Sequence, residues 1–288
     1  MELPRALAAV VTPLRRGVFD AGLLEAHLRF LEAGGLDGVL SLGSTGEFPS
    51  LAHEEKKAAL RATLRARGRL SVIAQVGSTA QPEVLELARL AEDEGAVALL
   101  APPPFYYRSV GVEGLAAFFE PLLERTRLPV LLYHFPLNTG LPIGEELIRA
   151  LGGRVRGLKD SSGDPRSPAR FLAVDPSLRV LVGNDHVLAA GLDTGAWGAI
   201  TAVANVFPGL VAAVVRSAGA ERARAQARLA RTRSLLERYP VPAGVKHLLG
   251  LLGVGASEVR PPLGGLTADA ARTLEREFRE LQEELGRS

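Results

Sequence analysis

Short apolar runs alternate with helix-like segments along the first 207 residues. The runs carry few polar positions, as expected for parallel strands that are covered on both faces. Between them, the apolar residues recur at helical spacing, and in 82–94 they fall at i, i+3, i+4 and i+7 and form one buried stripe. The expected strands are 6–11, 38–42, 71–76, 96–100, 130–134, 155–158, 180–182 and 197–203.

Eight such strand–helix units predict a closed TIM (β/α)8 barrel, an α/β fold with its helices outside. An open doubly wound sheet is the alternative, since it shows the same alternation. Such sheets often carry a glycine-rich turn after the first strand, whereas Thr12-Pro13-Leu14 follows the first run here. After residue 207 the strand signals fade, and helices are expected at 208–237, 241–252 and 267–285. We therefore divide the chain into a barrel core, 1–207, and the last barrel helix with a C-terminal helical extension, 208–288.

Composition narrows the class of protein. The chain has 288 residues, 47% of them hydrophobic, and no linker-like stretch, which favours one large core. No apolar run reaches the roughly 18–20 residues of a membrane span, and no signal peptide is recognisable. Cysteine is absent, which excludes thiol catalysis and disulfides. The five histidines show no metal-ligand spacing. We expect a soluble, cytoplasmic enzyme with no metal and no membrane contact.

The charge is nearly balanced, with 34 basic and 32 acidic residues. This balance is not typical of a nucleic-acid-binding surface. One segment, 216–238, carries seven arginines interspersed with alanine and leucine. We interpret it as a solvated or subunit-facing helix. The alternative is nucleic-acid binding, which predicts association that weakens steeply with salt.

In such a barrel the chemistry lies at the C-terminal ends of the strands. Polar residues gather there in this sequence. All three asparagines of the chain, Asn138, Asn184 and Asn205, follow predicted strands. The other polar segments at strand ends are 43–47 (GSTGE), 105–108 (FYYR), 133–140 (YHFPLNTG) and 159–163 (KDSSG).

Lys159 is the only lysine at a predicted strand end. A neutral lysine amine attacks carbonyl carbons, and an apolar barrel favours the neutral form by desolvation. The sequence therefore predicts a Schiff-base lysine, with a structural lysine paired with Asp160 or with other carboxylates at the C-terminal end of the barrel as the alternative. Ser44 and Thr45, between glycines, suit a carboxylate, although the same segment reads equally as a tight turn. Tyr133 in a strand is compatible with a core aromatic residue or with an acid–base group.

Taken together and in this order, the motifs GSTGE, PPPFYY, YHFPLNTG and GLKDSSG resemble the dihydrodipicolinate synthase/N-acetylneuraminate lyase superfamily. The resemblance extends from about residue 9 to residue 206, with a plausible match in the helical tail. It implies a homotetramer of (β/α)8 barrels that forms a lysine imine with pyruvate and uses no metal or organic cofactor.

The resemblance also implies residue roles. Lys159 forms the imine and Tyr133 relays protons. Thr45 links Tyr133 to a second tyrosine, Tyr107, which a neighbouring subunit contributes. The remaining implied substrate contacts are Ser44 and Thr45 on the keto-acid carboxylate, and the backbone of Ile200 in the wall of the site.

Asn138 bears on the choice of substrate. Dihydrodipicolinate synthases characteristically carry an arginine there, which clamps the carboxylate of the second substrate. His134 also replaces the usual asparagine. The motifs look closer to 4-hydroxy-2-oxoglutarate aldolases, which yield pyruvate and glyoxylate, and we expect that activity on a small 2-keto acid. Dihydrodipicolinate synthase and a 2-keto-3-deoxygluconate-type aldolase stay open, as does a non-catalytic, regulatory barrel that only binds pyruvate.

Overall fold

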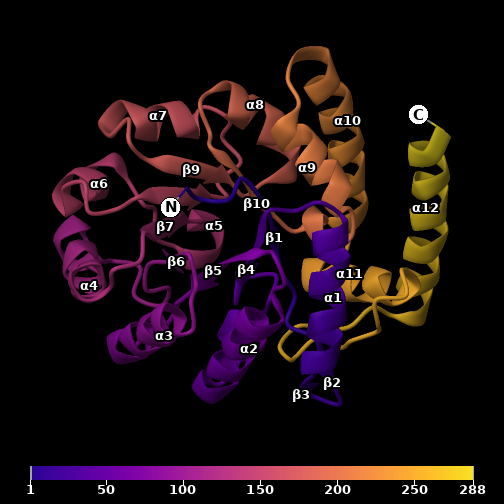
Figure 1. The fold of residues 1–288 in the computed structure, drawn as a ribbon, viewed down its shortest axis with the longest axis horizontal. Coiled ribbons are helices and arrows are strands. Elements are labelled where there is room, and N and C mark those ends of the chain that lie inside the picture. The colour runs from indigo at the N-terminus through magenta and orange to yellow at the C-terminus, as the bar shows by residue number, and fades with distance from the viewer. Residues whose placement is uncertain (1, 288) are drawn as a thin grey trace.

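The computed structural model describes residues 2–287, and its centre is a closed barrel of eight parallel strands (Figure 1). The strand order around the barrel is β1-β10-β9-β8-β7-β6-β5-β4, and β1 pairs with both β10 and β4. This closure confirms the predicted TIM barrel and rules out the open sheet. The strands are β1 (Ala6–Ala9), β4 (Gly38–Ser41), β5 (Ser71–Gln75), β6 (Ala98–Ala101), β7 (Val130–His134), β8 (Gly157–Asp160), β9 (Arg179–Val182) and β10 (Gly198–Thr201).

Two apolar layers hold the barrel together. The interior is filled by inward-facing side chains such as Leu40, Ile73 and Leu131, all fully buried. The larger outer layer lies between the strands and the surrounding helices. The stripe predicted in 82–94 is part of it, because Val84 and Leu87 are buried on α3.

Helices surround the barrel on all sides (Figure 1). Each strand is followed by at least one of them, as the predicted alternation requires. Their bounds are α1 (Ala21–Ala33), α2 (His53–Ala66), α3 (Gln81–Asp93), α4 (Val112–Arg125), α5 (Pro136–Thr139), α6 (Glu145–Leu151), α7 (Ser167–Val174), α8 (Leu188–Asp193) and α9 (Pro208–Arg216).

Two local predictions were wrong, and one feature was missed. The strand expected at 155–158 is β8, Gly157–Asp160, so Lys159 lies within the strand rather than after it. The helix expected at 208–237 is two helices, α9 and α10 (Gly219–Leu236), because Ser217 and Ala218 have extended backbone angles. A hairpin of β2 (Leu14–Arg15) and β3 (Val18–Phe19) was missed, since two-residue strands are too short to show periodicity.

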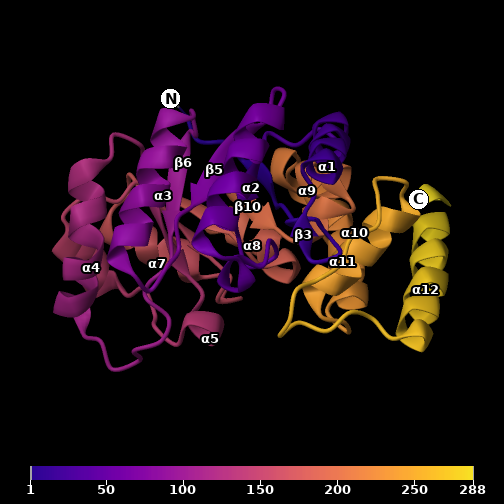
Figure 2. The ribbon, with the colours of Figure 1, turned by 90° about the horizontal axis from the view of Figure 1, so that it is seen from below.

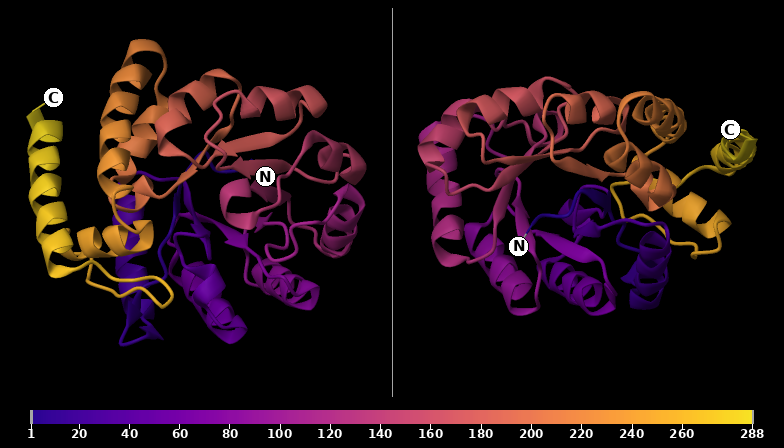
Figure 3. Two further views of the ribbon diagram at one scale, coloured as in Figure 1. Left: turned by 180° about the vertical axis from the view of Figure 1, so that it is seen from behind. Right: turned by 45° about the horizontal axis from the view of Figure 1, so that its top comes forward.

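The C-terminal region continues from α10 into α11 (Val241–Leu251) and α12 (Ala268–Arg287). Figure 3 shows α12 at the edge of the molecule, away from the barrel, and it contacts α10 and α11. In Figure 2 the N-terminus lies at one end of the barrel, and α5, which follows β7, lies at the other. None of the described helices combines the length and the apolar character that a membrane span requires. The division at residue 207 stays an interpretation; Pro208 begins α9.

Candidate active site

A cavity of about 620 Å³ opens at the C-terminal ends of the strands. It brings together most of the residues singled out from the sequence, which come from different strands. The predicted site residues that line it are Ser44, Thr45, Tyr133, Asn138, Lys159 and Ile200. Tyr107 does not line it within this chain.

Lys159 and Tyr133 form the floor of the cavity. They are register partners on the adjacent strands β8 and β7, and each is only 3% exposed. The Lys159 Nζ lies 4.5 Å from the centre of the Tyr133 ring. Asp160 points to the other face of the strand and accepts a hydrogen bond from the Ser162 backbone at 2.8 Å. Among the described residues, no ion pair joins Lys159 to Asp160, so the amine faces the cavity without a carboxylate partner.

Gly183, just after β9, makes room for this lysine. A Cβ atom at that position would lie 2.1 Å from the Ser161 Oγ and 3.1 Å from the Lys159 Cε. Any larger residue would therefore displace Ser161 or Lys159. The glycine at the end of β9 lets the lysine chain extend into the cavity.

Ser44 and Thr45 lie on the loop after β4. The Ser44 hydroxyl is 3.5 Å from the Tyr133 hydroxyl, at the long limit of a hydrogen bond. Thr45 is nearly buried at 9% exposure and lines the same cavity. The hydroxyl in contact with Tyr133 thus comes from Ser44, whereas the resemblance assigned that contact to Thr45.

A buried ion pair supports this loop from behind. The Glu47 backbone is left-handed (φ 59°), and its carboxylate accepts a hydrogen bond from the Lys246 Nζ at 2.5 Å. The Arg260 backbone N–H donates to the other carboxylate oxygen at 2.8 Å. Both ionic side chains are at most 1% exposed, and burial lowers the pKa of Lys246 while Glu47 opposes the change. Sequence analysis missed this pair, because 199 residues separate its members.

Tyr106 and Tyr107 lie outside the cavity. They are 76% and 69% exposed, and their rings meet edge to face at 5.2 Å. The aromatic residue of this segment that does line the cavity is Phe105. A role for Tyr107 in catalysis would therefore require a second copy of the chain.

The three asparagines have different surroundings. Asn138 and Asn184 line the cavity. Asn205 is fully buried and bridges two segments, since it donates to the Ala9 carbonyl at 2.8 Å and accepts from the Val11 N–H at 3.2 Å. Asn205 is therefore a structural residue, and a position after a strand was not enough to assign it to the site.

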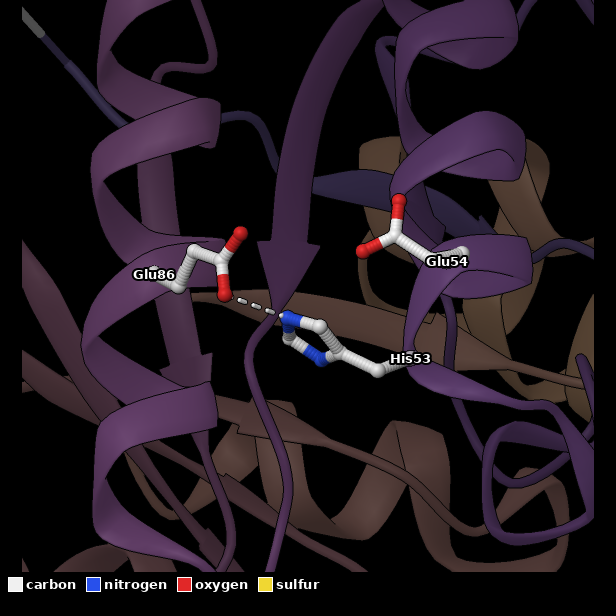
Figure 4. A group of neighbouring side chains, drawn as sticks. All are labelled: His53, Glu54 and Glu86. Atoms are coloured by element: carbon white, nitrogen blue, oxygen red, sulfur yellow. Dashed lines mark hydrogen bonds and ion pairs between the residues drawn. The ribbon is translucent and has the colours of Figure 1, made fainter.

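Figure 4 shows another polar group, in which His53 of α2 points toward Glu86 of α3. The His53 Nε2 lies 2.9 Å from the Glu86 carboxylate, and Glu54 completes a set whose ligand atoms lie within 4.8 Å. Lys57 pairs with Glu54 at 2.9 Å and with Glu86 at 2.6 Å, so a side-chain cation already occupies this group. We interpret it as an ion-pair network between two helices.

The arginine-rich segment, 216–238, runs from the last residue of α9 through α10. Several of its arginines pair with acidic residues elsewhere in the fold, for example Arg216 with Asp37 at 2.7 Å and Arg222 with Asp193 at 2.5 Å. Such pairing reduces the free positive charge that phosphate binding requires. The structure favours a helix that packs on its neighbours over a nucleic-acid surface.

Family models and curated relatives both relate this chain to dihydrodipicolinate synthases. The model of the dihydrodipicolinate synthetase family matches residues 2–281. The chain is 40% identical over 262 residues to an uncharacterized DapA-like lyase of Chloroflexus aurantiacus, covering 86% of this chain and 87% of that protein. It is 34% identical over 294 residues to 4-hydroxy-tetrahydrodipicolinate synthase of Methanopyrus kandleri, covering 97% of each chain.

Solved structures show the same fold. YagE, a prophage protein of the dihydrodipicolinic acid synthase family from E. coli K12, was determined in complex with pyruvate. It superposes with a TM-score of 0.91 at 26% identity, over 96% of this chain and 98% of that one. The 4-hydroxy-tetrahydrodipicolinate synthase of Methylacidiphilum fumariolicum SolV gives a TM-score of 0.92 at 27% identity, over 99% and 98%.

Proposed function

The chain belongs to the dihydrodipicolinate synthetase family and is a lyase of that family, and from this premise we propose that it cleaves a 2-keto acid through a Lys159 imine. The observation that carries the proposal is the buried Lys159 amine, 4.5 Å from the Tyr133 ring at the floor of a large cavity. A buried amine that has no carboxylate partner is more easily deprotonated, and the neutral amine is the form that attacks a carbonyl carbon.

The proposed substrate is 4-hydroxy-2-oxoglutarate, which gives pyruvate and glyoxylate. The Lys159 Nζ attacks carbon 2, and loss of water leaves an iminium. A base removes the proton of the 4-hydroxyl, the bond between carbons 3 and 4 breaks, and its electron pair passes to the iminium nitrogen. Carbon 4 leaves as the aldehyde of glyoxylate. Protonation of the enamine at carbon 3 and hydrolysis by water then release pyruvate and the free amine.

Tyr133 is the proposed base and acid for these proton transfers, because its ring covers the amine and its hydroxyl lies 3.5 Å from that of Ser44. Ser44 and Thr45 would hold the carboxylate next to the keto group, and the Ile200 backbone would line the wall of the site. Tyr107 would complete the proton path from a neighbouring subunit, which is consistent with its exposure in a single chain. We accordingly propose a cytoplasmic homotetramer that needs no cofactor.

The choice of 4-hydroxy-2-oxoglutarate is supported by Asn138. This side chain is exposed at the mouth of the cavity and cannot form the two-pronged contact of an arginine with a carboxylate. A second candidate is 4-hydroxy-tetrahydrodipicolinate synthesis from pyruvate and aspartate semialdehyde. It is favoured by the names of relatives such as that of Methanopyrus kandleri.

Borohydride trapping tests whether Lys159 forms an imine with pyruvate. Pyruvate with borohydride should add a stable mass to the peptide containing Lys159. Lys159→Ala should abolish the adduct and lower turnover by at least about 1,000-fold, since the covalent route is lost. Lys57→Ala, which removes a lysine of the ion-pair network on α2, is the matched control and should label like the wild type. An adduct that persists in Lys159→Ala would disprove the proposal.

A substrate panel separates the two candidates. We expect cleavage of 4-hydroxy-2-oxoglutarate, measured by glyoxylate release, to exceed condensation of pyruvate with aspartate semialdehyde. If only the condensation proceeds, the second candidate is correct and the interpretation of Asn138 is wrong. Labelling of Lys159 by pyruvate without turnover of any 2-keto acid would instead support the non-catalytic, pyruvate-binding barrel.

A further inference from the structure

One arginine lines the cavity although it lies outside every sequence motif. It is Arg233, from the last turn of α10. Within the described residues, three charged side chains line this cavity: Glu47, Lys159 and Arg233. The Glu47 charge is already balanced by Lys246 and the Arg260 N–H. Lys159 is the proposed nucleophile, so Arg233 is the cationic group left to bind an anion, and among the described residues it carries the only guanidinium that lines the cavity.

Arg233 is held in place from outside the cavity. Its Nε lies 3.4 Å from the Glu237 carboxylate, one helical turn away, and that same oxygen lies 2.9 Å from the His186 Nε2. The Arg233 Nε is buried and has no hydrogen-bond partner among the described residues. Glu237 is thus shared between His186 and Arg233, and its ion pair with Arg233 is made through the Nε atom of the guanidinium.

A second acid, Asp185, lies near Arg233. Asp185 lies close enough to interact electrostatically with Arg233, and it is almost completely buried. Burial raises the pKa of Asp185, and Arg233 opposes that change. The guanidinium itself stays protonated at any working pH.

Topology sets Arg233 apart from the hydroxyls proposed for the first carboxylate. Ser44 follows β4, whereas α10 packs against the short helix η2 (Asp185–Val187), which follows β9. In the strand order, β4 and β9 are three positions apart in a ring of eight, and β9 is next to β8, which carries Lys159. The cavity consequently offers one anion-binding group on each of two separate sides. Asn138 follows β7, so it lies on the other side of β8 from Arg233.

The geometry points to Arg233 as the binding group for a distal carboxylate, which makes the substrate a dicarboxylic 2-keto acid. This inference rests on the proposed imine chemistry and names the substrate class of the same site. The planar guanidinium matches a carboxylate with two parallel hydrogen bonds. A cavity of about 620 Å³ accommodates a five-carbon diacid. The first carboxylate would contact Ser44 and Thr45, and the second would contact Arg233.

The experiment compares two keto acids. 4-Hydroxy-2-oxoglutarate carries the distal carboxylate, and 4-hydroxy-2-oxopentanoate has a methyl group in its place. We expect Arg233→Gln to lower kcat/KM for the first by about 10- to 100-fold, because a charge-assisted contact is lost. The same variant should change kcat/KM for the second by less than about threefold. Arg231→Gln, on the same helix but paired with Glu284 outside the cavity, is the matched control and should alter neither.

The outcomes separate this inference from the proposed function. Equal losses on both substrates in Arg233→Gln, with normal borohydride trapping, would show a structural role and overturn the inference. So would a wild-type enzyme that prefers the methyl substrate. If pyruvate forms no adduct with wild-type Lys159, the imine chemistry itself fails. A loss confined to the dicarboxylate, with Lys159 labelled as in the wild type, would support the assignment.

Discussion

The two ends of the cavity are built in different ways. The inner end consists of Ser44, Thr45, Tyr133, Lys159 and Ile200, which lie on strands or directly after them; four of the five are at most 9% exposed. The outer end consists of Asn138, Asn184 and Arg233. They come from a short helix, a loop and the end of α10, and they are partly or fully exposed.

This difference in construction matches two different functions, catalysis at the inner end and substrate selection at the outer end. A barrel strand holds its side chains rigidly through two neighbouring strands, which suits groups that must meet one carbon atom within a fraction of an ångström. Loops and added helices tolerate substitution without loss of the core. The inner end would therefore fix the imine chemistry, and the outer end would select the substrate.

Lys246→Met tests how firmly the inner end is supported. Removing the lysine leaves Glu47 buried at 0% exposure without its ionic partner, which typically costs about 3–5 kcal/mol. We expect a fall of that size in the free energy of unfolding, measured by urea denaturation. The double variant Glu47→Gln/Lys246→Met should recover part of the loss, since no uncompensated charge remains. A change below about 1 kcal/mol would show that the pair does not support the loop.

Tyr133→Phe tests chemistry at the inner end without removing its packing. The ring over Lys159 stays, and the hydroxyl is lost. We expect borohydride trapping of pyruvate at equilibrium to persist, with turnover lowered by about 100-fold or more, as is typical when a proton-transfer group is removed. Turnover close to that of the wild type would assign Tyr133 to the core alone.

The sequence predicted the residues of the inner end and two of the outer end, Asn138 and Asn184, but it did not predict Arg233. Eight apolar runs located the strands, and the rule that barrel chemistry lies at their C-terminal ends drew attention to Lys159 and Ser44. Arg233 left no such signal. It lies in a helix with several other arginines, and only the packing of α10 against η2, the short helix after β9, shows that it lines the cavity.

Packing over long sequence separations explains the other misses as well. The pair of Glu47 with Lys246 joins a loop after β4 to α11, and nothing local distinguishes Lys246 from a surface lysine. Asn205 shows the opposite error, because a polar residue after a strand is equally suited to bridging backbone groups. Periodicity gives the elements, but contacts between distant elements are decided by the tertiary structure.

His27→Leu tests a buried contact between α1 and the segment after β10, where the His27 Nε2 lies 3.1 Å from the Asn205 carbonyl oxygen. Complete burial lowers the pKa of His27 from 6.5 to about 4. Between these two pH values His27 is protonated in the unfolded chain but not in the folded chain. The free energy of unfolding therefore decreases as the pH falls from 6.5 toward 4. Between about pH 7.5 and about pH 4.5 we expect this group to cost roughly 2–3 kcal/mol. Urea denaturation of His27→Leu should show a correspondingly flatter pH dependence, and an unchanged slope would contradict the assignment.

Asn138→Ala should have the smallest effect on activity. Comparing it with Arg233→Gln shows which side of the outer end selects the substrate. The amide is exposed and neutral, and such a hydrogen bond contributes about 0.5–1.5 kcal/mol, so kcat/KM for 4-hydroxy-2-oxoglutarate should fall by no more than about tenfold. The corresponding loss in Arg233→Gln should be larger, because a charged contact is removed. If Asn138→Ala proves the more damaging of the two, then the side of the cavity that follows β7 selects the substrate. Arg233 would in that case serve the packing of α10 against the barrel.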